Sequence, residues 1–501
     1  MANTSINSIS LKAMVDKASN QIIFVESDND FIDVIFSFLT IPMGKIIRLT
    51  PNQSIRLGVG CLNNVYASVK NMDLKHFRTE ACKDMLLSPR SAAESQCKNL
   101  KVKIYNDEAT QYFMCSLNIA NCKFSYCKDL NCDSCGVKIN MEKNLLVTPD
   151  GGVFVKGLSR LIITDDLQVI PPLTAASLPL LTKLGVMDVN TMEEVTINVG
   201  VDEVLNLLMR SLASKTPLTE SLLKNKPRRK FCNEYQGINT EPQMVKDKTN
   251  LEGTISVKLI VSKSKKMVCY AEAGEDFVNL LLSFLTIPLG FIVKHMGNRS
   301  LQGCIDQLYK SVQDLDDQYM MSSYHKEMLL TPKLVPGFCY ENHLLGTEEA
   351  TYYYAGSTGF LSTDRVLLAT QTALAPKSIS PFAPSAFGRQ ESAQTSIRPI
   401  AFRDPKANHH QHKNAQVQGF LEGPAMFTVT DDLNIRPVSL IYGLSLLNEL
   451  KVPLTDIYVQ TVQVHEEEAL RLLVAAFLGD SALTITFIRE SEQDKRLNQE
   501  Q

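Results

Sequence analysis

The sequence predicts an α+β protein of two tandem repeats, each a pair of ββαβα units with mixed sheets. The first observation behind this prediction is that residues 37–42, Ser-Phe-Leu-Thr-Ile-Pro, return unchanged at residues 283–288. The two copies stay in register for about thirty residues on either side. The second observation is that each copy alternates short β-rich runs with apolar residues at helical spacing. We expect each copy to build its own hydrophobic core.

Length and composition describe a globular protein with more than one core. The chain has 501 residues, whereas single domains usually have about 100–200. Apolar residues make up 44% and charged residues 21% of the sequence, and the formal net charge is −3. A chain so close to neutral has no global positive field that would attract nucleic acid or an anionic membrane. We therefore expect neither a membrane nor nucleic acid as a partner.

Each copy opens with the same order of elements. In the first copy, residues 11–15 and 21–26 are rich in β-forming residues and flank a polar turn, which predicts a β-hairpin. Apolar residues at helical spacing then predict a helix over residues 31–39. Residues 45–49 are predicted to form a strand, and residues 59–69 a second helix.

The later part of each copy repeats this ββαβα order. In the second copy, the predicted elements are residues 427–430, 434–436, 439–450, 457–464 and 466–478. Leu-Thr-Ile-Pro-Leu at 285–289 parallels Leu-Lys-Val-Pro-Leu at 450–454, so we expect these segments to occupy equivalent helix-to-strand corners. The chain is therefore predicted to contain four related units in two pairs.

The repeats set the predicted domain boundaries. The first repeat spans residues 1–223, with units at about 8–90 and 153–223 and a cysteine-rich insert at 97–145. A polar, basic linker at 224–253 joins it to the second repeat. The second repeat spans residues 254–490, with units at about 254–332 and 418–490 and a low-complexity insert at 356–419.

No segment of the sequence predicts export or membrane anchoring. Residues 1–17 lack a basic region followed by an apolar core, so no secretory signal is predicted. The longest apolar run, residues 277–293, is shorter than the about 20 residues that a bilayer requires, and Pro288 interrupts it. Twelve cysteines in such a chain are expected to be reduced thiols, some of them on a metal. The expected location is intracellular, in the cytoplasm or the nucleus.

A cysteine-rich stretch predicts a metal site. Five cysteines crowd into residues 114–136, namely Cys115, Cys122, Cys127, Cys132 and Cys135. Cys132 and Cys135 form a C-x2-C turn followed by Gly136, a spacing that lets two thiolates reach one tetrahedral Zn²⁺. We expect Cys115 and Cys122 to complete the site, with Cys127 as the competing ligand. A closed four-cysteine site is structural, because catalytic zinc keeps one position open. Ordinary free thiols and redox chemistry are the alternatives.

Other candidate residues have structural explanations. Asp165-Asp166 and Asp431-Asp432 lie at the tips of predicted hairpins, where aspartate favours turn geometry. The sequence contains no glycine-rich phosphate loop, no H-E-x-x-H and no G-x-S-x-G motif. The basic run from Lys226 to Lys230 lies in the predicted linker, where it is either a solvated segment or a nuclear targeting signal.

The repeated motifs carry a family resemblance. The hairpin pattern S-x-K-x-x-V-x-K starts at Ser10 and again at Ser256, and both copies contain E-x-x-x-D-F and L-T-I-P-[ML]-G. Together with the C-x2-C-G turn and the T-D-D-L hairpins, these motifs resemble a plant family of uncharacterised proteins, domain of unknown function 674. The resemblance spans nearly the whole chain outside the linkers. It implies a plant source, tandem copies and no assigned activity.

The sequence leaves the biochemical function unknown and supports three hypotheses. The first is a non-enzymatic intracellular interaction protein with a structural zinc site and an unidentified protein partner. The second is an enzyme whose site lies at a junction between units, where pockets are common, and gathers Glu26, Asp30 and Cys61. The third is nucleic-acid binding through the cysteine-rich loop, helped by Lys98, Lys101, Lys103, Lys123 and Lys128, against which the near-neutral total charge argues. No small-molecule ligand can be named from the sequence.

Overall fold

The protein has a mixed α+β fold with several antiparallel sheets. The structure is a computed structural model that describes residues 8–49, 59–104, 111–115, 123–132, 134–143, 153–157, 160–172, 179, 182, 189–223, 254–297, 303–340, 343–357, 367–369, 395–399, 401–407 and 419–489. The predicted linker at 224–253, with its basic run, and most of the low-complexity insert at 356–419 lie outside the described residues.

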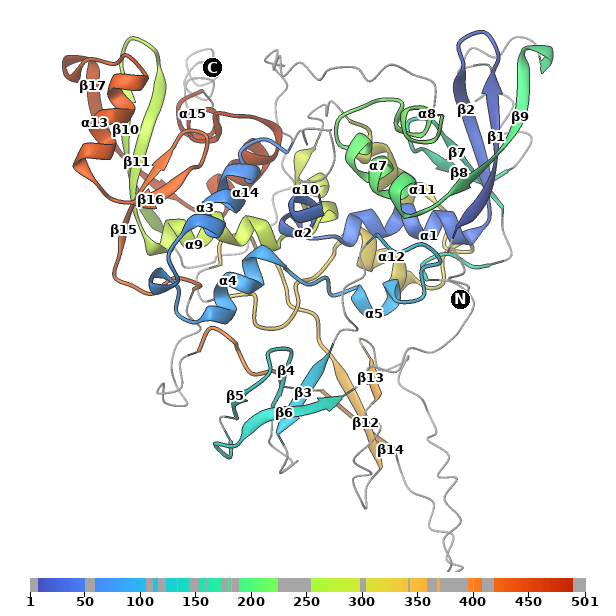
Figure 1. The fold of residues 1–501 in the computed structure, drawn as a ribbon, viewed down its shortest axis with the longest axis horizontal. Coiled ribbons are helices and arrows are strands. Elements are labelled where there is room, and N and C mark those ends of the chain that lie inside the picture. The colour runs from blue at the N-terminus through green and yellow to red at the C-terminus, as the bar shows by residue number, and fades with distance from the viewer. Residues whose placement is uncertain are drawn as a thin grey trace, which may run out of the picture.

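Two five-stranded sheets stand at opposite ends of the molecule (Figure 1). The first has the strand order β8-β7-β2-β1-β9, and the second has the order β16-β15-β11-β10-β17. The first sheet consists of β1 (Ile9–Asp16), β2 (Gln21–Ser27), β7 (Leu161–Thr164), β8 (Val169–Ile170) and β9 (Met192–Val199). The second consists of β10 (Ile255–Ser262), β11 (Met267–Gly274), β15 (Met426–Thr430), β16 (Ile435–Pro437) and β17 (Ile457–Val464).

The predicted hairpins are confirmed, but the prediction of mixed sheets is wrong. β1 pairs with β2 and β10 pairs with β11, with Lys12 opposite Glu26 and Lys258 opposite Glu272. Every pairing in the two large sheets is antiparallel, because each sheet joins two hairpins side by side and adds one antiparallel edge strand.

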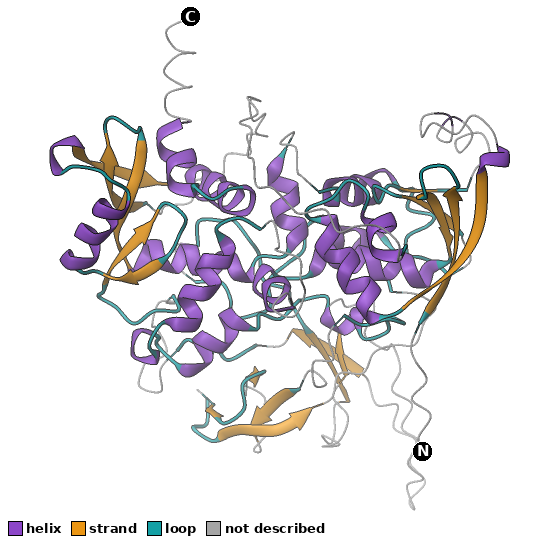
Figure 2. Ribbon diagram, turned by 45° about the horizontal axis from the view of Figure 1, so that its top comes forward, coloured by secondary structure: helices purple, strands orange, loops and turns teal. Residues whose placement is uncertain are grey.

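Helices occupy the space between the two sheets (Figure 2). From the first half of the sequence come α1 (Asn29–Ser37), α7 (Val201–Ser211) and α8 (Pro217–Leu222). From the second half come α9 (Glu275–Ser283), α14 (Glu466–Leu478) and α15 (Ala482–Thr484), while α13 (Leu440–Glu449) lies on the outer side of the second sheet. Helix α1 is buried from Phe31 to Ser37, so it runs through the interior rather than along a surface.

The segment predicted as a strand at residues 45–49 is a helix. Helix α2 (Met43–Leu49) begins directly after Pro42, and its residues Met43, Ile46 and Ile47 are buried. These three residues recur at helical spacing, a signal that the run of β-forming residues obscured. A short apolar run does not distinguish strand from helix by composition, so packing decides its structure.

The predicted equivalence of residues 285–289 and 450–454 is wrong for a related reason. The first segment leads into helix α10 (Leu289–Met296), whereas the second leads into strand β17. The proline in both segments ends one element without specifying the type of the next. The elements predicted at 457–464 and 466–478 are confirmed as β17 and α14.

The two halves of the sequence cross at the centre of the molecule. Pro42 and Pro288 form an antiparallel bridge, beside which Met43 N–H donates to Ile287 O (3.0 Å) and Leu289 N–H donates to Ile41 O (3.0 Å). Beyond this crossing, each chain segment enters the opposite lobe (Figure 1). Helices α3 (Leu62–Asn71) and α4 (Glu80–Leu87), drawn in blue, lie among elements of the second half. Helices α11 (Ile305–Asp314) and α12 (Ser323–Leu330), drawn in yellow, lie beside α1 and α7 of the first half.

Equivalent hydrogen bonds hold the exchanged helices in the two lobes. Ser68 Oγ on α3 accepts from Ile435 N–H of the second sheet, and Ser311 Oγ on α11 accepts from Val169 N–H of the first sheet, both at 2.9 Å. Likewise, Cys61 N–H donates to Gly479 O (3.1 Å), and Cys304 N–H donates to Ser211 O (2.8 Å). Each sheet is therefore covered by helices from both halves of the sequence.

We expect the two halves to remain associated when they are made as separate chains. A break after residue 238 leaves all the exchanged helices in place, because it falls between the last element of the first half and the first of the second. Co-expressed fragments 1–238 and 239–501 should co-purify and elute together at the size of the intact chain on gel filtration. Two fragments that each elute as stable monomers would contradict the exchange.

Two smaller sheets and several short elements complete the fold. Beneath the two lobes in Figure 1 lie a four-stranded sheet of order β4-β3-β6-β5 and a three-stranded sheet of order β13-β12-β14. The strands of the latter are β12 (Tyr353–Ser357), β13 (Leu367–Ala369) and β14 (Thr395–Pro399). The short helical elements are α5 (Glu94–Cys97), η1 (Phe38–Thr40), η2 (Leu74–His76), η3 (Val189–Thr191), η4 (Phe284–Thr286), η5 (Leu454–Asp456) and η6 (Ile485–Arg489).

Candidate metal centre

The four-stranded sheet brings distant cysteines to one place. Its strands are β3 (Tyr112–Cys115), β4 (Phe124–Ser125), β5 (Leu130–Asn131) and β6 (Lys138–Lys143). Strand β6 lies between β3 and β5, with Ile139 opposite both Cys115 and Leu130. The end of β3 therefore lies across from the turn that joins β5 to β6, and this turn carries Cys132 and Cys135.

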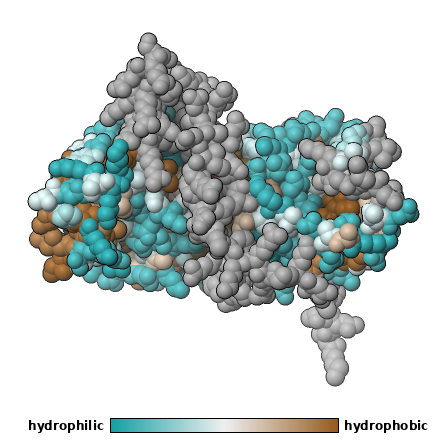
Figure 3. Space-filling view, turned by 90° about the horizontal axis from the view of Figure 1, so that it is seen from above, coloured by the Kyte–Doolittle hydropathy of each residue, from teal (hydrophilic) through white to brown (hydrophobic). Residues whose placement is uncertain are grey.

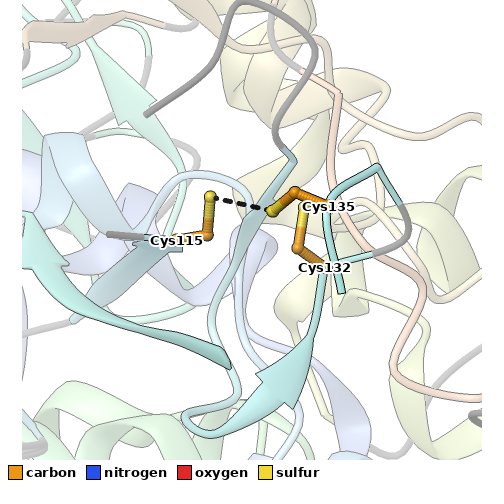
Figure 4. Close-up of side chains that lie close together, drawn as sticks. All are labelled: Cys115, Cys132 and Cys135. Atoms are coloured by element: carbon orange, nitrogen blue, oxygen red, sulfur yellow. Dashed lines mark hydrogen bonds between the residues drawn. The ribbon is translucent and has the colours of Figure 1, made fainter. Parts of the chain in front are cut away.

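Three thiols converge at this point (Figure 4). The sulfur atoms of Cys115, Cys132 and Cys135 all lie within 4.8 Å of one another. Cys135 Sγ donates a hydrogen bond to Cys115 Sγ at 3.6 Å. Cys115 and Cys132 are buried and Cys135 is half-buried, so the cluster is largely shielded from solvent.

The C-x2-C-G turn has the tight backbone that the sequence predicts. Gly136 adopts a φ of +71°, a left-handed conformation that glycine reaches without steric cost. Its N–H donates to Cys132 O at 2.8 Å, and Cys132 N–H donates to Val137 O at 2.9 Å. These two bonds close the turn and hold Cys132 and Cys135 on the same side.

Backbone groups around the turn favour a thiolate at Cys132. Burial alone would raise the pKa of this thiol, but N–H groups of Ser134, Lys123 and Cys135 point at its sulfur and lower the pKa to about 7. A thiolate is the form that ligates a metal.

The two remaining candidate ligands differ in their position. Cys127 follows β4, where Ser125 Oγ accepts from its N–H at 2.9 Å, and its sulfur is not among the three that converge. Burial raises the pKa of Cys127 to about 11, which keeps it a neutral thiol at physiological pH. Cys122 lies outside the described residues.

An aromatic cluster that the sequence did not reveal anchors the cysteine-rich sheet to the body. Phe402 of the second half contacts the rings of Tyr112, Phe124 and Tyr126, with ring centroids 6.0–6.3 Å apart. Phe124 also exchanges backbone bonds with this segment, donating to Ala401 O (3.0 Å) and accepting from Arg403 N–H (2.7 Å). The contacting residues lie far apart in the sequence, so no local pattern could have predicted this cluster.

A half-buried arginine joins the same cluster to the first half. The Arg90 guanidinium lies 5.0 Å from the ring centroid of Tyr112 and 5.1 Å from that of Tyr126. It also pairs with Glu94, with Nε 3.2 Å from Oε2. The metal-candidate sheet is therefore held by contacts to both halves of the chain.

The residues proposed for an enzyme site have separate partners. Glu26 forms an ion pair with Arg160 (3.6 Å), and Asp30 forms one with Lys101 (2.7 Å). Cys61 lies at the exchange contact, where its thiol donates to Gly479 O at 3.0 Å and burial raises its pKa. The three side chains are thus engaged at different places in the fold.

The paired aspartates fix helices as well as turns. Asp165 Oδ1 and Oδ2 accept from Thr219 N–H (2.8 Å) and Thr219 Oγ1 (2.6 Å) on α8. Asp431 binds Thr484 of α15 in the same way, at 2.7 Å for both bonds. Residues 165–166 and 431–432 form the predicted turns, and Asp165 and Asp431 also tie each hairpin to a helix later in the same half.

Comparison with known proteins identifies a family but no activity. In the part of the chain that the structure describes, none of the helices has the length and apolar character needed to cross a bilayer. No curated protein and no solved structure matches the chain. A family model described as "Protein of unknown function (DUF674)" matches residues 5–467, which is most of the sequence. The chain therefore belongs to the DUF674 family.

Proposed function

We propose that the cysteine cluster is a structural zinc site. Cys115, Cys132 and Cys135 would supply three thiolates, and Cys122 the fourth, with Cys127 as the alternate ligand. This proposal rests on the convergence of three sulfur atoms, two from the C-x2-C-G turn and one from the end of β3. Four sulfurs around one Zn²⁺, each about 2.3 Å from the metal, lie about 3.5–4 Å from one another. The 3.6 Å separation between Cys115 and Cys135 supports this geometry.

Zinc would supply much of the stability of the small sheet. Strands β4 and β5 have only two residues each, too few to hold a sheet by backbone pairing alone. The apolar group on the metal side comprises Phe113, Ile139 and the cysteines themselves. Thiolate–metal bonds would replace the missing core, as in other small zinc-dependent folds.

Purified protein is expected to contain about one Zn²⁺ per chain under reducing, chelator-free conditions. Cys132→Ser should reduce the bound zinc to below about a tenth and speed amide exchange in residues 111–143, while the two large sheets remain protected. Cys127→Ser is the matched control and should retain the metal if Cys122 is the fourth ligand. Elemental analysis with hydrogen exchange measures both effects. Less than about half a Zn²⁺ per wild-type chain would refute the site.

We further propose that the protein acts by binding another protein rather than by catalysis. A thiolate-only site supports this, because it leaves no open position for a substrate. An intracellular location, in the cytoplasm or the nucleus, belongs to the same proposal, since free thiolates persist in a reducing compartment. Affinity purification of the full chain and of Cys132→Ser tests it. A partner lost with the variant would be one bound through the zinc sheet.

We infer that the two halves arose by tandem duplication. The equal strand orders of the two large sheets support this inference, as do the reciprocal bonds of Ser68 and Ser311. Asp33 and Asn279, which hold the same position in the two halves, also have the same role. Asp33 binds the backbone of residues 153–155, and Asn279 binds that of residues 420–421.

A further inference from the structure

In the two five-stranded sheets that the structure describes, one edge lacks the protection that the other three have. A free strand edge is a template for pairing with another chain, and proteins protect edges with charge, proline or shortness. Strand β8 has two residues and is followed by Pro171-Pro172, and β16 has three residues and ends in Pro437. The other edges of these two five-stranded sheets, β9 and β17, have eight residues each.

These two long edges occupy equivalent positions but differ in chemistry. In β9, Glu193 and Glu194 lie opposite Val15 and Met14, and Glu194 forms an ion pair with Lys12 at 2.9 Å. In β17, the equivalent positions hold Tyr458 and Val459. Strand β17, Ile-Tyr-Val-Gln-Thr-Val-Gln-Val, contains no charged residue and no proline. The first sheet is thus protected by acidic side chains, whereas the second is not.

Helix α13, which packs over β11 of the same sheet, also exposes apolar side chains. Helix α13 buries Gly443 and Leu447 against the sheet, while Leu440 and Ile441 are 78% and 80% exposed. A surface helix usually turns polar residues to solvent, and one that is apolar all round is normally buried. Its exposed side therefore has the character of an interface.

The exposed helix and the free edge form one surface. Ile260 lies opposite Val459 and belongs to the apolar group that contains Leu447 of α13, so Val459 faces the same side of the sheet as the helix. Val459 is 64% exposed, and Leu454, in the turn between α13 and β17, is 68% exposed. Figure 3 shows apolar side chains gathered at this end of the molecule.

We propose that a second copy of this chain covers this surface, with β17 pairing antiparallel to its counterpart and α13 packing beside it. The pairing would join two five-stranded sheets into one of ten strands. A two-fold axis at Gln460 sets Val459 opposite Thr461 and Ile457 opposite Gln463, on the side that carries the helix. Both copies use the same surface in this interface, so the assembly closes as a dimer and does not extend into a fibre.

The uncharged sequence of β17 favours a second copy of the chain as its partner. An uncharged strand is best met by another uncharged strand edge, because a buried charge without a partner is costly. The described chain offers one such long edge, β17 itself, since β9 carries two glutamates. A standard interface buries about 800 Å² per partner, so the strand edge and the exposed apolar side chains of α13 would both have to contribute.

A matched pair of substitutions tests the proposal in the full-length protein. Thr461 on β17 and Thr196 on β9 are equivalent exposed residues, and both lie opposite a lysine, Lys258 and Lys12 respectively. Thr461→Glu would place two like charges in the dimer interface, whereas Thr196→Glu adds a charge to an edge that is already acidic. Analytical ultracentrifugation should find a dimer of wild-type chain and of Thr196→Glu at about 10 μM. Thr461→Glu should raise the dimer Kd more than about tenfold.

Three outcomes would overturn the proposal. The first is a wild-type chain that stays monomeric up to about 100 μM. The second is a Thr461→Glu dimer as tight as the wild type, which would place the interface elsewhere. The third is a dimer that Ile441→Glu weakens and Thr461→Glu does not, which would mean helix docking without strand pairing. Far-ultraviolet circular dichroism of each variant confirms that the subunit fold is retained.

Discussion

Gly303→Ala is expected to destabilise the protein by about 3 kcal/mol or more, because the added methyl group has no room. A Cβ at this position would lie 2.2 Å from Ser211 O and 2.3 Å from Leu212 C, both backbone atoms at the end of α7. Backbone atoms of a packed helix cannot shift as a flexible side chain would. Gly60 makes the reciprocal contact, with its Cβ position 2.5 Å from Ala476 O, so Gly60→Ala should have a similar effect.

Gly274→Ala is the matched control. Gly274 has a φ of −73°, and a Cβ there would meet nothing within 4 Å, so its replacement should change the unfolding free energy by less than about 1 kcal/mol. Urea denaturation followed by circular dichroism measures all three variants. If Gly303→Ala unfolded within about 2 °C of the wild type in a thermal scan, the close approach of the exchanged segment would be disproved.

Asp33→Ala is expected to cost about 3–5 kcal/mol of stability, because it leaves three buried N–H groups without an acceptor. Asp33 Oδ1 accepts from Phe154 (2.8 Å) and Val155 (2.9 Å), and Oδ2 accepts from Val153 (2.8 Å). Asp33→Asn should be much milder. Asn279 holds the equivalent position of the second half, with Oδ1 accepting two backbone N–H groups.

The same carboxyl group should make stability depend on pH. Burial raises the pKa of Asp33 from its ordinary 3.8 to about 6, although the three N–H bonds oppose the shift. The folded state then binds this proton more tightly than the unfolded state, so the stability contributed by Asp33 falls as pH rises from about 4 to 6. Relative to Asp33→Asn, the wild type should gain roughly 1 kcal/mol between pH 7 and pH 5. A difference between the two proteins that is independent of pH would contradict the buried carboxyl.

The sequence predicted individual elements better than their arrangement. Alternating patterns and helical spacing located both opening hairpins, β17 and α14. The exchange of helices between lobes was not predictable, because the two halves carry the same residues at the exchange contacts. Ser68 and Ser311 are equivalent, as are Cys61 and Cys304, so α3 presents the same groups to either sheet. Matching residues in the two halves specify the type of contact but not which half makes it.

The candidate metal centre was predictable only in its local part. The C-x2-C-G spacing placed Cys132 and Cys135 on one turn, and both the turn and the approach of Cys115 are observed. The support behind it was not predictable, because Phe402 and Arg90 reach the sheet through tertiary contacts with no sequence period.

The exchange of helices imposes an order on the synthesis of this protein. The strands of the first sheet and the helices of its own half are complete once residue 223 has been made, but α11, which binds β8 through Ser311, and α12 extend to residue 330. At about 5–20 residues per second, a ribosome needs roughly 5–20 s to supply them. During that interval the first half cannot complete its core, although all of its own residues have been made. A nascent chain that pauses in this window is the form of the protein most exposed to aggregation and to chaperones.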